Sequence, residues 1–290
     1  MRYKVIHRTE YEYRSGVSVS QHMLHLRPRT TERQRVDAFH LAVEPAIGTS
    51  NIHEDFHGNL VDIFSIDTPH KTLIVTSTSH LEVSSPTWPD PASTPAWESA
   101  RDGAPSELAD GRPIEFLYDS VKVAQSATFR DYALKSFTPA RPFLAALLDL
   151  VNRMYRDFRF DPKATNTTTP IEEAFTKKRG VCQDFAHIGI ACLRSLGLPA
   201  RYVSGYLETV PPPGKVRLAG ADASHAWLSA WCPGLGWVDA DPTNNLLPGD
   251  RHVTIGWGRD FGDVSPIRGV AVGGGDHTLK VGVDVLREGG

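Results

Sequence analysis

The sequence feature that most constrains this chain is an apolar helix pattern with a cysteine at its start. It begins at Gly180, runs through apolar residues as far as Leu196, and ends at Gly197 and Pro199. Glycine commonly ends a helix and proline cannot continue one, so the pattern predicts a helix with Cys182 in its first turn. The unpaired N–H groups and the dipole there favour a thiolate, which is nucleophilic. The alternative is a small apolar residue at a helix start.

A predicted β-hairpin downstream supplies a base for this thiol. Its two strand-like segments are joined by a turn centred on Pro233-Gly234, and alternation places His225 and Trp227 on one face of the first segment. With the turn centred there, His225 lies opposite Asp241 on the same face. Asp239 has the same parity, so alternation alone leaves both aspartates as partners of His225.

Cys182, His225 and Asp241 therefore form a candidate set of nucleophile, base and orienting carboxylate. His187 is a poorer base, because five helical residues rotate it roughly 140° away from Cys182. Substitutions of Cys182, His225 and Asp241 are therefore the first tests that the sequence suggests.

Four motifs in this order resemble the bacterial transglutaminase-like cysteine-enzyme family. They are Gly180-Val181-Cys182-Gln183-Asp184-Phe185-Ala186-His187, the segment 197–206, His225-Ala226-Trp227, and the segment 236–244. The resemblance implies that Cys182 is the nucleophile, that His225 is the base, and that the carboxylate is Asp241, which precedes Pro-Thr, and not Asp239. It also implies that Tyr206 faces the site. A core tyrosine with a satisfied hydroxyl is the alternative.

The expected fold is α+β. Residues 1–83 show short alternating runs separated by turn signals such as Ser15-Gly16, which predict an N-terminal antiparallel β domain. Residues 84–113 contain six prolines and predict an extended linker without regular elements. Residues 114–290 are expected to form the papain-like, transglutaminase-like core that the resemblance implies, with helices packed on an antiparallel sheet and with C-terminal strands.

Composition excludes several classes of function. A net charge of −3 gives no electrostatic footprint for a nucleic acid, and no stretch approaches the ~20 apolar residues of a membrane span. Together with the lack of a secretory apolar run at the N-terminus, this predicts a cytoplasmic protein without a membrane partner. Three cysteines are too few for a disulfide framework, and no Cys/His spacing matches zinc, so we expect no metal and no cofactor.

The resemblance implies an enzyme that acts on a protein or peptide through a thioester. Water would intercept the thioester in a protease or amidase, and an amine would do so in a transglutaminase. Interception by an amine needs an apolar channel, which Trp227, Trp231 and Trp237 could build unless they belong to the core. Hydrolysis is favoured, because hydrolytic members are expected in this broad family. A non-catalytic binding module is the alternative, and filled positions at Cys182, His225 and Asp241 argue against it.

Overall fold

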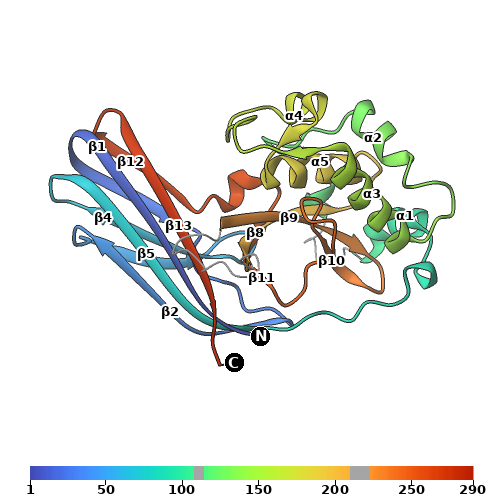
Figure 1. The fold of residues 1–290 in the computed structure, drawn as a ribbon, viewed down its shortest axis with the longest axis horizontal. Helices are drawn as coiled ribbons and strands as arrows, with labels where there is room; N and C mark the ends of the chain where they lie inside the picture. The colour runs from blue at the N-terminus through green and yellow to red at the C-terminus, as the bar shows by residue number, and fades with distance from the viewer. Residues whose placement is uncertain (108–113, 210–222, 290) are drawn as a thin grey trace, which may run out of the picture.

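The computed structural model describes residues 1–107, 114–209 and 223–289. Two larger antiparallel sheets lie side by side, and the helices gather around the second sheet (Figure 1). The helices are α1 (Trp97–Glu107), α2 (Ala127–Leu134), α3 (Phe143–Asp157), α4 (Ile171–Lys177) and α5 (Cys182–Arg194). The α+β fold predicted from the sequence is confirmed.

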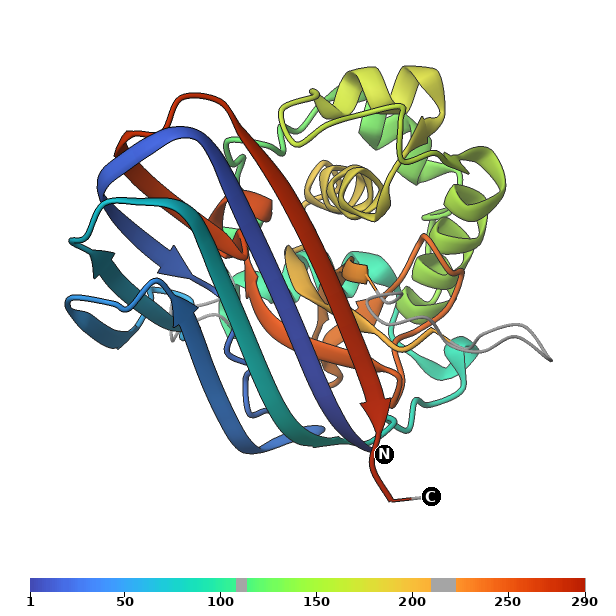
Figure 2. The same ribbon diagram turned by 60° about the vertical axis from the view of Figure 1, so that its left-hand side comes forward.

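The first sheet is organised around one long strand, β1 (Arg2–Leu24), which pairs with four other strands. β1 is continuous through Ser15-Gly16, where a turn was predicted, but it bends back on itself there (Figure 2), with a register shift against β5 between Glu12 and Val17. The other strands of this sheet are β2 (Gln34–Glu44), β3 (Ser50–Glu54), β4 (Leu60–Ile66), β5 (His70–Val83), β12 (Ile267–Gly273) and β13 (His277–Arg287).

The last two strands of the chain return to the N-terminal sheet. Strand β13 pairs with β1 from Tyr3 to Tyr13, and β12 pairs with its second half, so the red and blue strands run together in Figure 2. The sequence division placed these strands with the core, and in this respect it was wrong. Alternation identifies a strand but carries no information about which edge the strand joins.

The proline-rich segment is also more regular than predicted. It contains a short 3-10 helix, Pro91–Ser93, and helix α1. Pro91 occupies the first position of its helix, where a missing N–H costs nothing. Trp97 is buried, and its Nε1 donates to the Thr138 carbonyl at 3.0 Å, so packing on the core stabilises this segment.

The second sheet carries the core, in the order β10-β9-β8-β11. Its strands are β8 (Ala200–Leu207), β9 (Ala223–Cys232), β10 (Gly236–Ala240) and β11 (His252–Gly258). Helix α5 packs on β8 and β9, closely enough that a Cβ on Gly189 would overlap the side chain of Leu228. The predicted helix and the predicted hairpin are both present.

The two sheets meet across a buried apolar cluster. The N-terminal sheet contributes Tyr3, Val5, Leu81, Val83, Val283 and Val285, and the core sheet contributes Tyr206, Val253 and Ile255. Polar bonds extend this contact: the Arg287 guanidinium donates to Glu208 at 2.6 and 2.8 Å, and Tyr3 Oη donates to the same carboxylate. Strands β8 and β11 are therefore supported by both ends of the chain.

Replacing Gly205 by alanine should destabilise the core sheet. Gly205 pairs with His225, and a Cβ there would overlap the Val253 carbonyl oxygen and lie 2.5 Å from the Trp227 ring. Because backbone cannot move aside easily, we expect the free energy of unfolding to fall by about 1–3 kcal/mol in urea denaturation. Gly16→Ala is the control, since nothing lies within 4 Å of its Cβ. Equal stability of the two variants would contradict this packing.

Candidate active site

The N-terminus of α5 places Cys182. The residue before it, Val181, is the N-cap, and its N–H donates to Asp184 Oδ2 at 2.8 Å, while Thr165 Oγ1 donates to the same oxygen at 2.6 Å. A Cβ on Gly180 would lie 2.5 Å from that oxygen, so this position requires glycine. Cys182 is half-buried, and as the first helical residue its N–H has no acceptor within the helix.

His225 stands between Cys182 and a carboxylate. Its Nε2 donates to Asp241 Oδ2 at 2.7 Å, and Cys182 lies close enough to the ring to raise its pKa. Burial lowers the pKa of His225, but the hydrogen bonds and charges of Asp241 and Cys182 outweigh this and raise it to about 10. The surroundings of the ring therefore favour an imidazolium.

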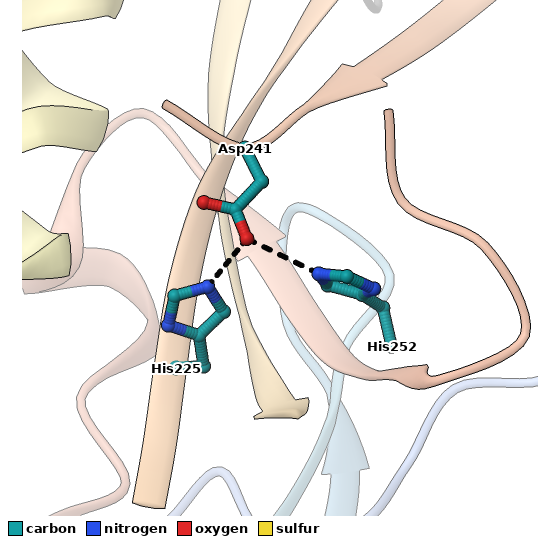
Figure 3. Close-up of side chains that lie close together, drawn as sticks. All are labelled: His225, Asp241 and His252. Atoms are coloured by element: carbon teal, nitrogen blue, oxygen red, sulfur yellow. Dashed lines mark hydrogen bonds and ion pairs between the residues drawn. The ribbon is translucent and has the colours of Figure 1, made fainter. Parts of the chain in front are cut away.

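Asp241 is fully buried, and its carboxylate accepts five hydrogen bonds. Oδ1 accepts the backbone N–H groups of Thr243 and Asn244 at 2.9 and 3.2 Å. Oδ2 accepts from His225, from His252 Nε2 at 3.2 Å and from Asn244 Nδ2 at 2.7 Å; Figure 3 shows the two histidines converging on this oxygen. Burial raises the pKa of Asp241, but its hydrogen bonds to His225 and His252 hold it well below the usual range.

His252 and Asn244 are parts of this site that the sequence did not reveal. His252 begins β11, and no spacing relates it to Asp241 or His225. Asn244 follows Asp241 in an Asp-Pro-Thr-Asn turn, a pattern in which the first side chain accepts N–H groups two and three residues on, so that signal was available.

The structure separates the two candidate aspartates. Asp239 Oδ2 accepts from Arg33 Nη2 at 2.9 Å, whereas Asp241 lies at His225. The predicted hairpin register was wrong by two residues: Gly236 pairs with Cys232 and Ala240 with Leu228, and Asp241 lies beyond the end of β10. A shift of two keeps every side chain on its face, which is why the expected proximity of His225 and Asp241 holds.

Tyr206 and Trp227, the two predicted substrate contacts, are both buried, whereas a contact with substrate requires an exposed side chain. Tyr206 is buried between the two sheets, and its hydroxyl hydrogen-bonds with His7 Nδ1 at 2.8 Å, as expected for a core tyrosine. Trp227 is completely buried, and its ring lies edge-on to His252 with centroids 5.3 Å apart. Its ring packs against those of His225 and His252.

His187 lies apart from this group. Its Nε2 accepts the Phe261 N–H at 3.1 Å, its ring packs against Tyr202, and burial lowers its pKa to about 3. A neutral, buried imidazole with a backbone partner has a structural role here.

One group of side chains in the described part of the chain has the composition of a metal site: His225, Asp241 and His252, whose ligand atoms lie within 4.8 Å of one another. The same atoms are engaged in the hydrogen bonds just described. A cation bound there would remove the proton that His225 donates to Asp241, and with it the base for Cys182.

A cysteine at a helix N-terminus, near a histidine on an antiparallel strand that is backed by a buried aspartate, is the arrangement that the sequence resemblance predicts. Comparison with known families agrees: residues 3–82 match the bacterial transglutaminase-like N-terminal region, and residues 131–242 match the transglutaminase-like superfamily. The chain belongs to this family of bacterial transglutaminase-like proteins.

Similar proteins cover both parts of the chain. An uncharacterised protein of Mycobacterium tuberculosis is 42% identical over 98% of this chain and 92% of its own length. A protein-glutamine gamma-glutamyltransferase of Pseudomonas aeruginosa is 33% identical over 36% of this chain and 16% of its own length. A solved structure from Cytophaga hutchinsonii, described as a candidate cysteine protease, superposes with a TM-score of 0.75 at 23% identity, covering 100% of this chain and 92% of its own.

The helices give one further finding. None of those in the described part of the chain has the length and apolar character needed to cross a membrane.

Exchanging the two aspartates for asparagine should distinguish their roles. Asp241→Asn removes the charge behind His225 and should lower the pKa of that ring. Each unit lost reduces the ratio of imidazolium to imidazole tenfold. Alkylation of Cys182 by limiting iodoacetamide at neutral pH should therefore slow by about tenfold or more. Asp239→Asn should leave that rate unchanged, because its partner is Arg33. Intact-protein mass spectrometry gives both rates, and the opposite ranking would contradict this assignment.

Proposed function

We propose that this protein is a cysteine-dependent acyl-transfer enzyme that acts on amide bonds of proteins or peptides. The observation that carries the proposal is the hydrogen bond from His225 to the buried Asp241, next to Cys182 at the N-terminus of α5. A thiol, a histidine with a raised pKa and an orienting carboxylate in hydrogen-bond contact are the groups that nucleophilic catalysis at a carbonyl requires.

In the proposed reaction the Cys182 thiolate attacks the carbonyl carbon of a carboxamide or peptide bond. The oxyanion that forms is stabilised by the N–H of Cys182 at the start of α5. The C–N bond then breaks as the His225 imidazolium gives its proton to the departing amine, leaving a thioester on Cys182 and a neutral imidazole. Asp241 holds the ring in the tautomer that can accept a proton in the second half of the reaction.

Water is the proposed acceptor of the acyl group. His225 takes a proton from water as the water attacks the thioester carbonyl. The C–S bond then breaks, which releases the carboxylic acid and restores the thiolate–imidazolium pair. The position of the tryptophans supports hydrolysis over transfer to an amine: Trp227 is buried beneath the histidines, and Trp231 and Trp237 pack against each other in a separate cavity. They do not line an apolar channel at Cys182.

Transfer to an amine is the second candidate. One observation favours it, the similarity of part of the core to a Pseudomonas aeruginosa protein that is named a protein-glutamine gamma-glutamyltransferase. Both candidates use the same three residues, and they differ only in the acceptor.

Removal of the thiol should abolish both reactions. We expect limiting iodoacetamide to label wild-type protein once, at Cys182, and we expect His225→Ala to slow that labelling. With glutamine-containing peptides, Cys182→Ala should lower product formation by about 10⁴-fold, to background. Peptide mass spectrometry with and without added lysine then distinguishes a free acid from a cross-linked product.

The matched control is Cys232→Ala, which removes a buried thiol from the far end of β9 and should retain labelling and turnover. Unselective labelling of the wild type, or full turnover by Cys182→Ala, would contradict the proposed mechanism.

A further inference from the structure

A cavity lies on the face of the core sheet that carries His225. Its volume is about 1010 Å³, and its walls include Arg201, Trp231, Trp237 and Trp257 from the sheet. Residues of the N-terminal segment and of the proline-rich segment, including Arg29 and Trp88, close the other side. Cys182, His225 and Asp241 are not among its walls, so this space is distinct from the candidate active site.

A stack of arginine and tryptophan side chains forms the floor of this cavity. The Arg201 guanidinium carbon lies 4.1 Å from the ring centroid of Trp237 and 3.8 Å from that of Trp257. Arg29 lies 3.7 Å from Trp257, and since two guanidinium groups cannot share one ring face at that distance, it occupies the opposite face. The stack holds the planar Arg201 group in a fixed orientation.

Three side chains that line this cavity each carry a buried N–H donor without an acceptor. The donors are Arg201 Nε, Trp231 Nε1 and Trp88 Nε1, all buried and all without a hydrogen-bond partner among the described residues. Most buried donors in proteins are paired, because leaving one unpaired costs about 1–3 kcal/mol. A group of unpaired donors around one cavity therefore indicates a ligand rich in acceptor oxygens.

The charge of Arg201 is only partly compensated. Its side chain is 8% exposed, and burial lowers its pKa to about 9 despite the opposing effect of Asp239, so the guanidinium is still protonated at neutral pH. Asp239 itself accepts a hydrogen bond from Arg33. A buried cation that is stacked between rings, with a free donor, is suited to a planar anion.

Acidic residues in the same walls limit the charge of that anion. Glu32, Glu54, Glu115 and Asp239 all line the cavity. Glu115 lies 3.2 Å from His57, and Asp239 is paired with Arg33, but their presence disfavours a doubly charged group such as phosphate. A singly charged carboxylate matches the donors with less of this repulsion.

We propose that this cavity binds a carboxylate attached to an aromatic or apolar group, the chemistry shared by an N-acyl amino acid and by the C-terminal residue of a peptide. The carboxylate oxygens accept from Arg201, a tryptophan N–H completes their coordination, and the apolar group lies against the indole rings. This site is independent of the reaction at Cys182.

Titration of the whole protein with two matched probes tests the proposal. N-acetylphenylalanine carries the carboxylate, and N-acetylphenylalanine amide is its neutral isostere. Because four tryptophans line the cavity, binding can be followed by tryptophan fluorescence and confirmed by calorimetry. We expect saturable binding of the acid in the millimolar range or tighter, and binding of the amide weaker by about tenfold or more. A tripeptide ending in phenylalanine distinguishes the two kinds of ligand. If it binds more tightly than N-acetylphenylalanine, the site recognises the C-terminus of a peptide. If it binds more weakly, the site recognises a free N-acyl amino acid.

Two variants connect the binding to this site. Arg201→Met should weaken binding of the acid by about tenfold while leaving alkylation of Cys182 unchanged, and Arg156→Met, an exposed arginine on α3, is the control. If Arg201→Met does not fold, Trp88→Phe takes its place, since it removes a donor and keeps a ring. Absence of saturable binding below about 10 mM, equal binding of acid and amide, or equal binding by wild type and the variant would overturn the proposal.

Discussion

The structure of the candidate site depends on one buried negative charge. Asp241 is fully buried, and an isolated carboxylate in that position would be too costly to keep ionised. Its five hydrogen bonds come from the turn that follows it, from β9 and from β11, so the ionised carboxylate joins three segments that are separate in the sequence. The orientation of His225 follows from this arrangement, and the position of the ring relative to Cys182 follows from its orientation.

His252 gives this network a connection to the rest of the molecule. It begins β11, the edge strand of the core sheet, which packs through Val253 and Ile255 on the N-terminal sheet. That sheet is completed by β13 from the other end of the chain. The first and last strands therefore support the strand from which His252 reaches Asp241. The N-terminal region contributes to the geometry of the candidate site without supplying Cys182, His225 or Asp241.

Much of the site could be predicted from the sequence, because residues close together in the chain determine the position of Cys182 and the face of His225. A glycine and an apolar run determine where α5 begins, and with it the position of Cys182. Parity along β9 determines the face of His225 and tolerates the error of two residues in register. The choice of Asp241 over Asp239 needed the family resemblance, because both have the same parity.

The remaining features depend on tertiary contacts. Sequence does not reveal that Tyr206 faces His7 across the two sheets, because these residues belong to different sheets. The partner of β13 is also undetermined by alternation, as is the packing of Trp97 that stabilises a helix among prolines. His252 was missed for the same reason, since only the closure of the sheet brings it to Asp241.

The most direct test of this account is an NMR titration of the His225 ring in protein labelled with ¹⁵N at histidine, with His225→Gln used to assign the signal. The account predicts that His225 remains doubly protonated through neutral pH and loses a proton near pH 10, because Asp241 and Cys182 both stabilise its charge. In Cys182→Ala the transition should move to lower pH, as one of the two partners is lost. Titration of His225 in the wild type at or below its ordinary pKa, about 6.5, would contradict the account.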